Sequence, residues 1–358
     1  MEKNEVLVKW IVEKVWIKDS SVKNHKEALN YALNELTTAG YWLSTINWIW
    51  HRAVHGGEYF KNPVVITDEV MAKITECSDL APLHNPANLE AMLACKELFP
   101  NLQQVAVFDT AFYQEMTPEH YLYALPMKYY ETYKIRRYWF HGISHQYIYE
   151  KLIADYNVPH AKVITCHVGN WVSITAIDNG KVIDTSMGMT PLEWVMMGTR
   201  SGSIDPAIIP YLMNHEHFDA DQIDTMLNKQ SWLLGISWIS SDMRDILTGV
   251  EKWDTKCVLA LNMYVNSLVK YIWAYTALLW GVDVIVLTAG VMEHRAIIRK
   301  ILLERLWYLW ITLDATVNQD ELPGGAIIST SDSKVAVIVI PTNEELMIAK
   351  KTFDLITK

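Results

Sequence analysis

The chain has 358 residues, of which 51% are hydrophobic and 20% are charged, and it carries a net charge of −10. The length favours two domains, the apolar content excludes a disordered chain, and the acidic balance argues against a nucleic-acid partner, which needs a basic face. The four cysteines form no Cys-x-x-Cys pair. We therefore expect reduced, buried thiols in a cytoplasmic protein.

The first third of the chain predicts a short series of strands and helices. EVLVKWIVEKVWI (5–17) has a strand pattern, and its charges exclude a signal peptide. A helix is expected around Lys26–Leu36 and another over VMAKITECSDL (70–80). QVAVFDTAF (104–112) predicts a buried strand.

The rest of the chain continues the alternation. KVITCHV (162–168) predicts a strand, and VSITAIDNGKVIDTS (172–186) predicts a hairpin with an Asn-Gly turn. After a run of helices, the apolar stretch 271–290 reads as a buried helix followed by a core strand rather than a membrane span. A helix (297–309), a strand (334–342) and a terminal helix (343–356) follow, so the pattern predicts an α/β architecture.

Three turns with glycine or polar residues follow strands: HVGNWVS (167–173), TAGVMEH (288–294) and PTNEE (341–345). Ligands of open α/β sheets bind at the carboxyl ends of strands, so these turns, together with SSDMRD (240–245), predict a nucleotide site. Trp171 argues against a nucleotide site at the first of these turns. A phosphate must come close to backbone N–H groups, which glycine permits and a tryptophan side chain obstructs.

Four charged residues lie at such places. Asp109 directly follows an apolar strand and Glu344 opens the last helix. Each carboxylate either positions a nucleophile or holds Mg²⁺, or it caps a helix. Arg52 and Arg200 lie beside glycine-containing turns, where a guanidinium binds phosphate or carboxylate, although a surface ion pair is the commoner fate of a lone arginine.

Histidines supply further candidates. His141 and His145 have the i, i+4 spacing of metal ligands in FHGISH, but no third ligand has suitable spacing, so zinc is not expected. A histidine that donates to a transferring phosphoryl group fits better. His84, between two prolines, either lines a pocket or satisfies a loop carbonyl.

The motifs together closely resemble the acetate kinase family over essentially the whole chain. The resemblance implies two ribonuclease-H-like domains of the actin-like ATPase type with a nucleotide cleft between them. It assigns residues 1–111 and the helix 345–358 to the first domain, and 112–344 to a second domain that binds nucleotide and forms a homodimer. The motifs that carry it are HRAVHGG, DLAPLHNPANL, VAVFDTAF, IRRYWFHGISH, TCHVGNWVSITAI, DTSMGMTPLEWVMMGTRSGSIDPAI, NKQSWLLGISWISSDMRD, TAGVMEH and VIPTNEELMIA.

The resemblance implies reversible, Mg²⁺-dependent transfer of a phosphoryl group from ATP to acetate, giving acetyl phosphate and ADP. Because acetate is already a carboxylate, no strong base is needed, and Asp109 is expected to orient the substrate. The implied catalytic residues are Asp109, His141 and Arg200. Arg52 and His84 are expected to bind acetate or acetyl phosphate, with His145 nearby, and Glu344 to hold Mg²⁺. The implied nucleotide contacts are His167, Val168, Gly169, Asn170, Trp171, Asp242, Met243, Arg244, Gly290, Val291, Met292, Glu293 and His294.

Two departures from the family bear on activity. The chain starts at a pattern that matches a later strand of the family, so the first hairpin, with its phosphate and Mg²⁺ contacts, is expected to be missing. We therefore expect little or no kinase activity from the chain as written. Met292 and His294 stand where the family has glycine and asparagine.

Tryptophan is the third departure, since tryptophan and glycine each occur 15 times. Two hypotheses account for this: UGA codons that the cell reads as glycine, or a decaying gene. The tryptophans that fall on family glycine positions are Trp139, Trp171, Trp194, Trp232, Trp238 and Trp273, with Trp10, Trp16, Trp50, Trp253 and Trp310 as further candidates.

Two alternatives to an acetate kinase remain from the sequence. A propionate or butyrate kinase would use the same motifs with a different acyl pocket, although GTRSGSIDP (198–206) and SSDMRD favour acetate. A non-catalytic remnant that only binds nucleotide is the other.

Overall fold

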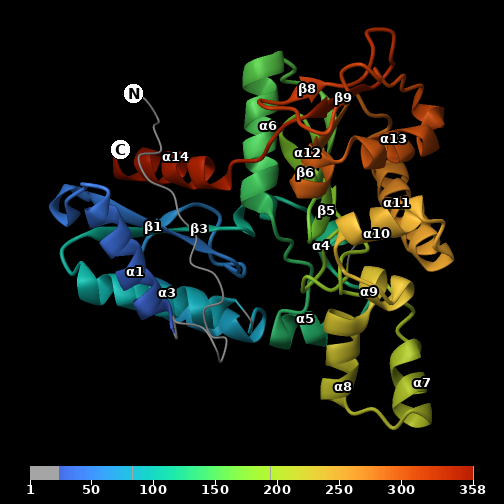
Figure 1. Ribbon diagram of the computed structural model, residues 1–358. Coiled ribbons are helices and arrows are strands. Elements are labelled where there is room, and N and C mark those ends of the chain that lie inside the picture. The colour runs from blue at the N-terminus through green and yellow to red at the C-terminus, as the bar shows by residue number, and fades with distance from the viewer. Residues whose placement is uncertain (1–23, 83, 194, 358) are drawn as a thin grey trace. The chain divides into compact units, whose positions relative to one another are not determined.

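The computed structural model describes residues 24–82, 84–193 and 195–357. The strand and hairpin expectations for the chain start, and Trp10, Trp16 and Trp194, lie outside these residues. The chain forms two compact units, Met1–Ala111 with Ile348–Lys358 (unit 1) and Phe112–Met347 (unit 2) (Figure 1).

Unit 1, in its described part, has a three-stranded sheet in the order β1-β3-β2. β1 (Trp48–Ala53) runs parallel to β3 (Gln103–Phe108), and β2 (Val64–Val65) runs antiparallel to β3. Around the sheet lie α1 (His25–Thr38), η1 (Leu43–Thr45), α2 (Asp68–Glu76), η2 (Cys77–Asp79) and α3 (Asn85–Leu98). The predicted helix at 26–36 and the predicted strand at 104–112 are confirmed within a few residues.

The core of unit 1 lies between this sheet and two helices. Phe60 stacks on Phe108 with ring centroids 4.4 Å apart, and Ile74 of α2 and Met92 of α3 complete the buried cluster. Burial of aromatic and aliphatic groups at this point fixes the carboxyl ends of β1 and β3, where Arg52 and Asp109 are found.

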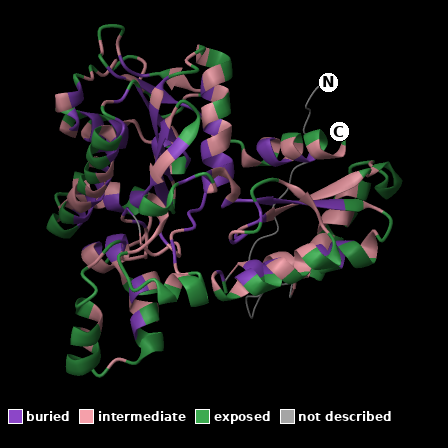
Figure 2. Cartoon of the chain, turned by 180° about the vertical axis from the view of Figure 1, so that it is seen from behind, coloured by how far each residue is buried: buried purple, intermediate pink, exposed green. Residues whose placement is uncertain are grey.

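Unit 2 contains a six-stranded sheet, among the described residues, in the order β6-β5-β4-β7-β9-β8. The central strands β4, β7 and β9 are parallel, so their carboxyl ends meet at one edge. All five residues of β7 are buried, as expected for a strand covered on both faces (Figure 2). The bounds are β4 (Lys162–Val168), β5 (Val172–Asp178), β6 (Lys181–Thr185), β7 (Val284–Thr288), β8 (Ala326–Ile327) and β9 (Ala336–Val339).

The predicted hairpin is confirmed. β5 and β6 pair antiparallel, and Asn179 and Gly180 between them have φ of 49° and 82°, the positive values that a two-residue type I′ turn requires. The α/β architecture expected from the alternation is confirmed as well.

Helices cover the sheet of unit 2. The long α11 contacts β4 and β5, which confirms that the apolar stretch before β7 is a packed helix. The helices and helical turns are η3 (Ala111–Tyr113), α4 (Pro118–Tyr121), α5 (Lys128–Tyr133), α6 (Gly142–Tyr156), α7 (Ile208–His215), α8 (Ala220–Thr225), η4 (Met226–Gln230), α9 (Trp232–Ser237), α10 (Met243–Glu251), α11 (Thr255–Leu278), α12 (Gly290–His294), α13 (Ala296–Arg305) and η5 (Trp307–Leu309). The terminal helix α14 (Glu344–Ile356) begins in unit 2 and continues into unit 1.

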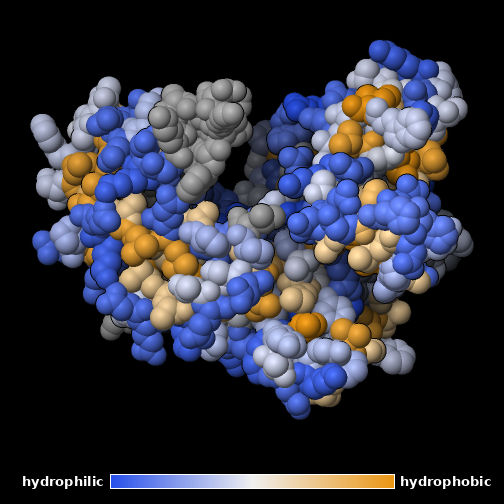
Figure 3. All heavy atoms as spheres, turned by 90° about the horizontal axis from the view of Figure 1, so that it is seen from below, coloured by the Kyte–Doolittle hydropathy of each residue, from blue (hydrophilic) through white to orange (hydrophobic). Residues whose placement is uncertain are grey.

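Polar residues cover much of the surface seen in Figure 3, and the cysteines lie inside the fold. Hydrophilic residues predominate on the face in Figure 3, and the hydrophobic ones form small separate groups. Within the described residues, no helix is long and apolar enough to cross a membrane. All four cysteines are free and buried, as expected for reduced thiols.

Candidate functional site

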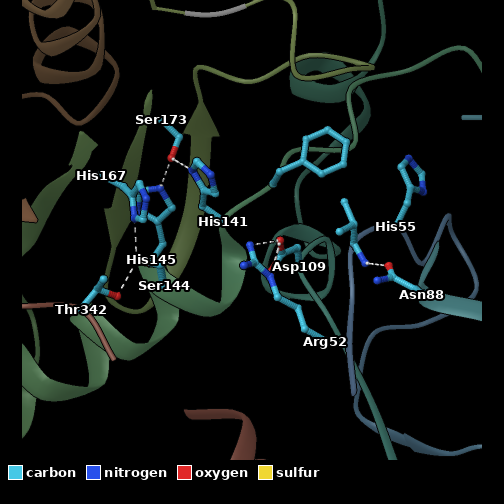
Figure 4. A network of polar contacts seen from close by, with 12 residues as sticks. Arg52, His55, Asn88, Asp109, His141, Ser144, His145, His167, Ser173 and Thr342 are labelled. Atoms are coloured by element: carbon cyan, nitrogen blue, oxygen red, sulfur yellow. Dashed lines mark hydrogen bonds and ion pairs between the residues drawn. The ribbon is translucent and has the colours of Figure 1, made fainter. Parts of the chain in front are cut away.

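The carboxyl ends of β1 and β3 in unit 1 bring Arg52 and Asp109 together. The two residues are 57 positions apart in the chain, yet Arg52 Nη2 lies 2.6 Å from Asp109 Oδ2, and Nε lies 3.1 Å from the same oxygen. The Asp109 side chain is 2% exposed, whereas that of Arg52 is 37% exposed. A buried carboxylate thus holds a partly exposed guanidinium in place (Figure 4).

The turn after β1 is fastened to α3 by two asparagines. Asn85 accepts from the His55 N–H at 3.2 Å and donates to the His55 carbonyl at 3.0 Å, and Asn88 accepts from the Val54 N–H at 3.1 Å. These hydrogen bonds hold the turn of HRAVHGG against the start of α3 within unit 1. His84 is the residue immediately before α3 and is half-buried.

In unit 2, a pocket of about 550 Å³ lies at the edge where β4 and β7 end. It gathers three of the segments that the sequence assigned to a nucleotide. Its lining residues are Gly169, Asn170, Asp242, Met243, Arg244, Gly290, Val291, His294, Arg295 and Glu321. Glu321 carries no sequence signal, because it lies in a loop without a recognisable motif.

The rim of this pocket is charged. Asp242 caps α10 by accepting from the Arg244 N–H at 2.8 Å, and the Arg244 guanidinium lies 2.5 Å from the same carboxylate. The hydrogen bonds from Arg244 lower the pKa of Asp242. The carboxylate is therefore ionised and could accept hydrogen bonds from sugar hydroxyls.

Three histidines meet around buried hydroxyls: His141 just before α6, His145 in α6 and His167 in β4 (Figure 4). His141 Nδ1 lies 3.0 Å from Ser173 Oγ, and His145 Nε2 lies 2.7 Å from the same oxygen. The rings of His141 and His167 stack with centroids 4.1 Å apart. Because one hydroxyl joins two rings, Ser173 fixes the orientation of both.

The network extends to the third turn. Ser144 Oγ lies 2.8 Å from His167 Nδ1 and 2.8 Å from Thr342 Oγ1, in the turn that follows β9. Ser144 lies between the two histidines of FHGISH, so its position in that motif was the signal that sequence reasoning missed.

His145 stays neutral in this environment. Burial lowers the pKa of His145 well below its ordinary value of 6.5, and the neighbouring His167 adds to the effect. The unfolded state then binds more protons than the folded state below that value, so stability falls as the pH decreases.

We predict that a His145→Gln variant loses less stability between roughly pH 7 and pH 5 than the unsubstituted protein, because the variant lacks this proton uptake on unfolding. Urea unfolding at several pH values measures the difference. The burial-lowered pKa of His51 in unit 1 is untouched by the substitution and accounts for part of the remaining slope. Identical slopes in both proteins would contradict the neutral assignment.

The carboxylate of Glu293 in α12 joins two of the three turns. Its Oε1 accepts from the Ala289 N–H at 2.6 Å, the Thr342 N–H at 3.1 Å and Thr288 Oγ1 at 3.2 Å. Ala289 has φ of 66° and ψ of 167°, a region that is essentially reserved for glycine. Glu293 therefore holds a strained turn in place, while its neighbour Met292 is fully buried.

We predict that Glu293→Ala lowers the free energy of unfolding by about 2–4 kcal/mol, because several hydrogen bonds to a charged acceptor are lost at once. Glu293→Gln keeps one acceptor oxygen and should lose about half as much. Chemical denaturation measures both losses. An alanine variant as stable as the unsubstituted protein would show that Glu293 does not stabilise this turn.

Trp171 lies between two predicted catalytic residues of unit 2. The Arg200 guanidinium carbon lies 4.5 Å from the centroid of its ring, and the His141 ring stacks at 6.2 Å. Burial lowers the pKa of Arg200. The indole ring of Trp171, in the HVGNWVS turn, therefore lies close to both His141 and Arg200.

Glu344 is the first residue of α14, two positions after Thr342. The described residues contain no group of three or more histidine, cysteine, aspartate or glutamate side chains that could hold a metal ion. Mg²⁺ commonly uses one or two carboxylates together with substrate phosphates, so a single carboxylate such as that of Glu344 suits Mg²⁺ better than a metal that needs a protein cage.

Comparisons with known proteins agree with the motifs. Residues 1–350 match the acetokinase family. The chain is 48% identical to an acetate kinase of Thermoanaerobacterium thermosaccharolyticum, over 97% of this chain and 92% of that protein.

Solved structures are similar over nearly the same extent. The crystal structure of Porphyromonas gingivalis acetate kinase matches with a TM-score of 0.89 and 42% identity, over 94% of this chain and 86% of that chain. A propionate kinase from Francisella tularensis matches with a TM-score of 0.86 and 40% identity, over 91% of this chain and 83% of that one.

Proposed function

The chain belongs to the acetokinase family, as its motifs predicted, and we propose that it transfers the γ-phosphoryl group of ATP reversibly to acetate. The products are acetyl phosphate and ADP. The observation that carries the proposal is the convergence of the nucleotide segments on one pocket in unit 2, next to a buried histidine network.

We assign ATP to this pocket. The backbone N–H group of Gly290 at the start of α12 suits a phosphate oxygen, because no Cβ obstructs its approach. The ionised Asp242 suits the hydroxyls of a ribose. Arg244 and His294 at the rim add positive charge or donors for the nucleotide.

The reaction needs positioning and charge stabilisation rather than a base. A carboxylate oxygen of acetate attacks the γ-phosphorus, and the bond from that phosphorus to the β,γ-bridging oxygen breaks, so ADP leaves with the electron pair. Acetate has no proton to lose. Asp109 accordingly acts by holding Arg52, and the Arg52 fork binds the acyl carboxylate or acetyl phosphate, with His84 as a further ligand contact.

His141 and Arg200 donate to the oxygens of the transferring group, where negative charge accumulates in the transition state. Ser173 holds the His141 ring and fixes the direction of its other nitrogen. Glu344 would hold Mg²⁺, which neutralises charge on the nucleotide phosphates when bound.

We also propose that the protein is a homodimer formed through unit 2. Exposed apolar side chains on α7, Ile208, Tyr211 and Met213, support this. Light scattering after size exclusion measures the mass, and a monomer at micromolar concentration would remove the proposal.

An acyl-hydroxamate assay tests the substrate. The protein, purified from its own organism, is incubated with ATP, Mg²⁺, hydroxylamine and either acetate, propionate or butyrate. We expect the highest kcat/KM with acetate. A higher value with propionate would reassign the substrate, and nucleotide binding without hydroxamate from any acid would favour the non-catalytic alternative.

A further inference from the structure

Tryptophan occupies left-handed backbone positions in this chain more often than a bulky residue should. Of the twelve non-glycine residues with positive φ in the described part of the chain, six are tryptophans. Bulky L-residues avoid this region because Cβ meets the following carbonyl oxygen, whereas glycine enters it freely. The six are Trp139, Trp232, Trp238, Trp253, Trp280 and Trp310.

The end of α10 shows why the backbone needs this conformation. The N–H of Trp253 donates to the Val250 carbonyl at 3.0 Å, and the N–H of Asp254 donates to the Gly249 carbonyl at 3.0 Å. This pair of bonds defines a Schellman motif, and Trp253 stands at its left-handed position with φ of 59°. Glycine is the usual residue there.

The end of α11 repeats the motif. The N–H of Trp280 donates to the Ala277 carbonyl at 3.0 Å, and the N–H of Gly281 donates to the Thr276 carbonyl at 2.9 Å. Trp280 has φ of 55°. The comparison with family motifs did not single out this tryptophan, so the backbone geometry identifies it independently.

The end of α1 has the same motif with the usual residue. The N–H of Gly40 donates to the Thr37 carbonyl at 3.0 Å, and the N–H of Tyr41 donates to the Leu36 carbonyl at 3.2 Å. Gly40 has φ of 90°. One chain therefore uses glycine and tryptophan at equivalent backbone positions.

The indole rings gain little from these positions. Trp253 and Trp280 are 85% and 91% exposed, although tryptophan is highly buried on average. Trp139 and Trp232 are buried, but their indole N–H groups have no hydrogen-bond partner among the described residues. The rings of Trp139 and Trp232 do contact Tyr113 and Tyr264, with centroids 5.8 and 6.0 Å apart, but they lack the polar contact that a buried indole normally makes.

We propose that the native protein has glycine at these six positions, because its gene specifies them with UGA codons that its own cell reads as glycine. UGA is read as tryptophan in some genetic codes and as glycine in others. A single decoding rule explains positive φ, exposed rings and unpartnered indoles together, whereas independent mutations would not select glycine positions.

The same rule bears on Trp171, whose φ is not positive. If UGA encodes it, the ring among His141 and Arg200 is absent from the native protein, and a residue without Cβ follows Asn170. This consequence rests on the proposed function, whereas the argument from the six backbone positions does not.

Two direct measurements decide the proposal. The genomic codons at the six positions are read first, and peptides of the protein from its own organism are then sequenced by mass spectrometry. We expect UGA in the gene and glycine in the peptides. UGG codons, or tryptophan in the native peptides, would overturn the proposal, and neither result depends on enzymatic activity.

Variants test the backbone argument separately. Trp253→Gly and Trp280→Gly should each raise Tm, whereas Trp253→Ala and Trp280→Ala should raise it less, since alanine removes the exposed ring but keeps Cβ. Gly40→Trp should lower Tm. Equal effects of glycine and alanine would show that the ring, not the left-handed backbone, is responsible.

Discussion

Replacing Asp109 with asparagine is expected to lower kcat/KM for acetate by about 10²–10³-fold. Asparagine offers one oxygen and no charge, so the two-nitrogen contact from Arg52 to the buried carboxylate is lost. The guanidinium is then held less firmly toward the acyl substrate. Steady-state kinetics with acetate as the varied substrate measures the change.

A surface aspartate of the same unit supplies the control. Asp68 pairs with Lys96 at 2.6 Å, but its side chain is 85% exposed, so Asp68→Asn should leave kcat/KM unchanged. Arg52→Lys keeps the positive charge and loses the fork, and it should resemble Asp109→Asn rather than Asp68→Asn. An Asp109→Asn enzyme with full activity would refute the role given to the pair.

Replacing His141 with asparagine is expected to lower kcat by about 10²–10³-fold, because the donor to the transferring phosphoryl group is removed. His141 has φ of 56°, and asparagine tolerates this left-handed conformation, so the start of α6 should be preserved. Single-turnover kinetics with saturating ATP separates the chemical step from binding.

His217 allows a matched control, since it also has positive φ, with a value of 57°, and it is exposed. His217→Asn makes the same change in the same backbone conformation outside the histidine network, and it should leave kcat unchanged. Ser173→Ala keeps His141 but removes the hydroxyl that orients it, so an intermediate loss is expected. If His141→Asn and His217→Asn behave alike, His141 does not act on the transferring group.

Much of the sheet in unit 2 could be predicted from the sequence. The parallel strands β4, β7 and β9 are mainly apolar, each is followed by a glycine or polar turn, and parallel strands bring such turns to one edge. The Asn179-Gly180 hairpin could also be predicted from the sequence, since only a few residue types accept two successive positive φ values.

Long-range contacts of the site could not be predicted in the same way. The pairing of Arg52 with Asp109 could not be predicted from the sequence, because the register of β1 on β3 sets it. Glu293 is expected to contact the nucleotide, and the structure adds that its carboxylate accepts from Ala289 in its own turn and from Thr342 in the turn after β9. Only tertiary structure brings those turns within reach of one carboxylate.

The family resemblance pointed to five of the six tryptophans with positive φ, and only the structure identified Trp280. A bulky residue in the left-handed region costs about 1–2 kcal/mol, so six of them would cost roughly 6–12 kcal/mol. That is comparable with the whole stability of a typical folded domain, about 5–15 kcal/mol. Glycine at these positions removes the conflict, which is why the decoding of UGA matters for any experiment on recombinant protein.

The most direct test of the central claim is the reverse reaction with protein purified from its own organism. ADP, Mg²⁺ and acetyl phosphate are supplied, and ATP is measured by luciferase luminescence. The account predicts ATP formation that requires all three components and the protein. Acetyl phosphate consumption without ATP, or no consumption at all, would contradict phosphoryl transfer between acetate and the nucleotide.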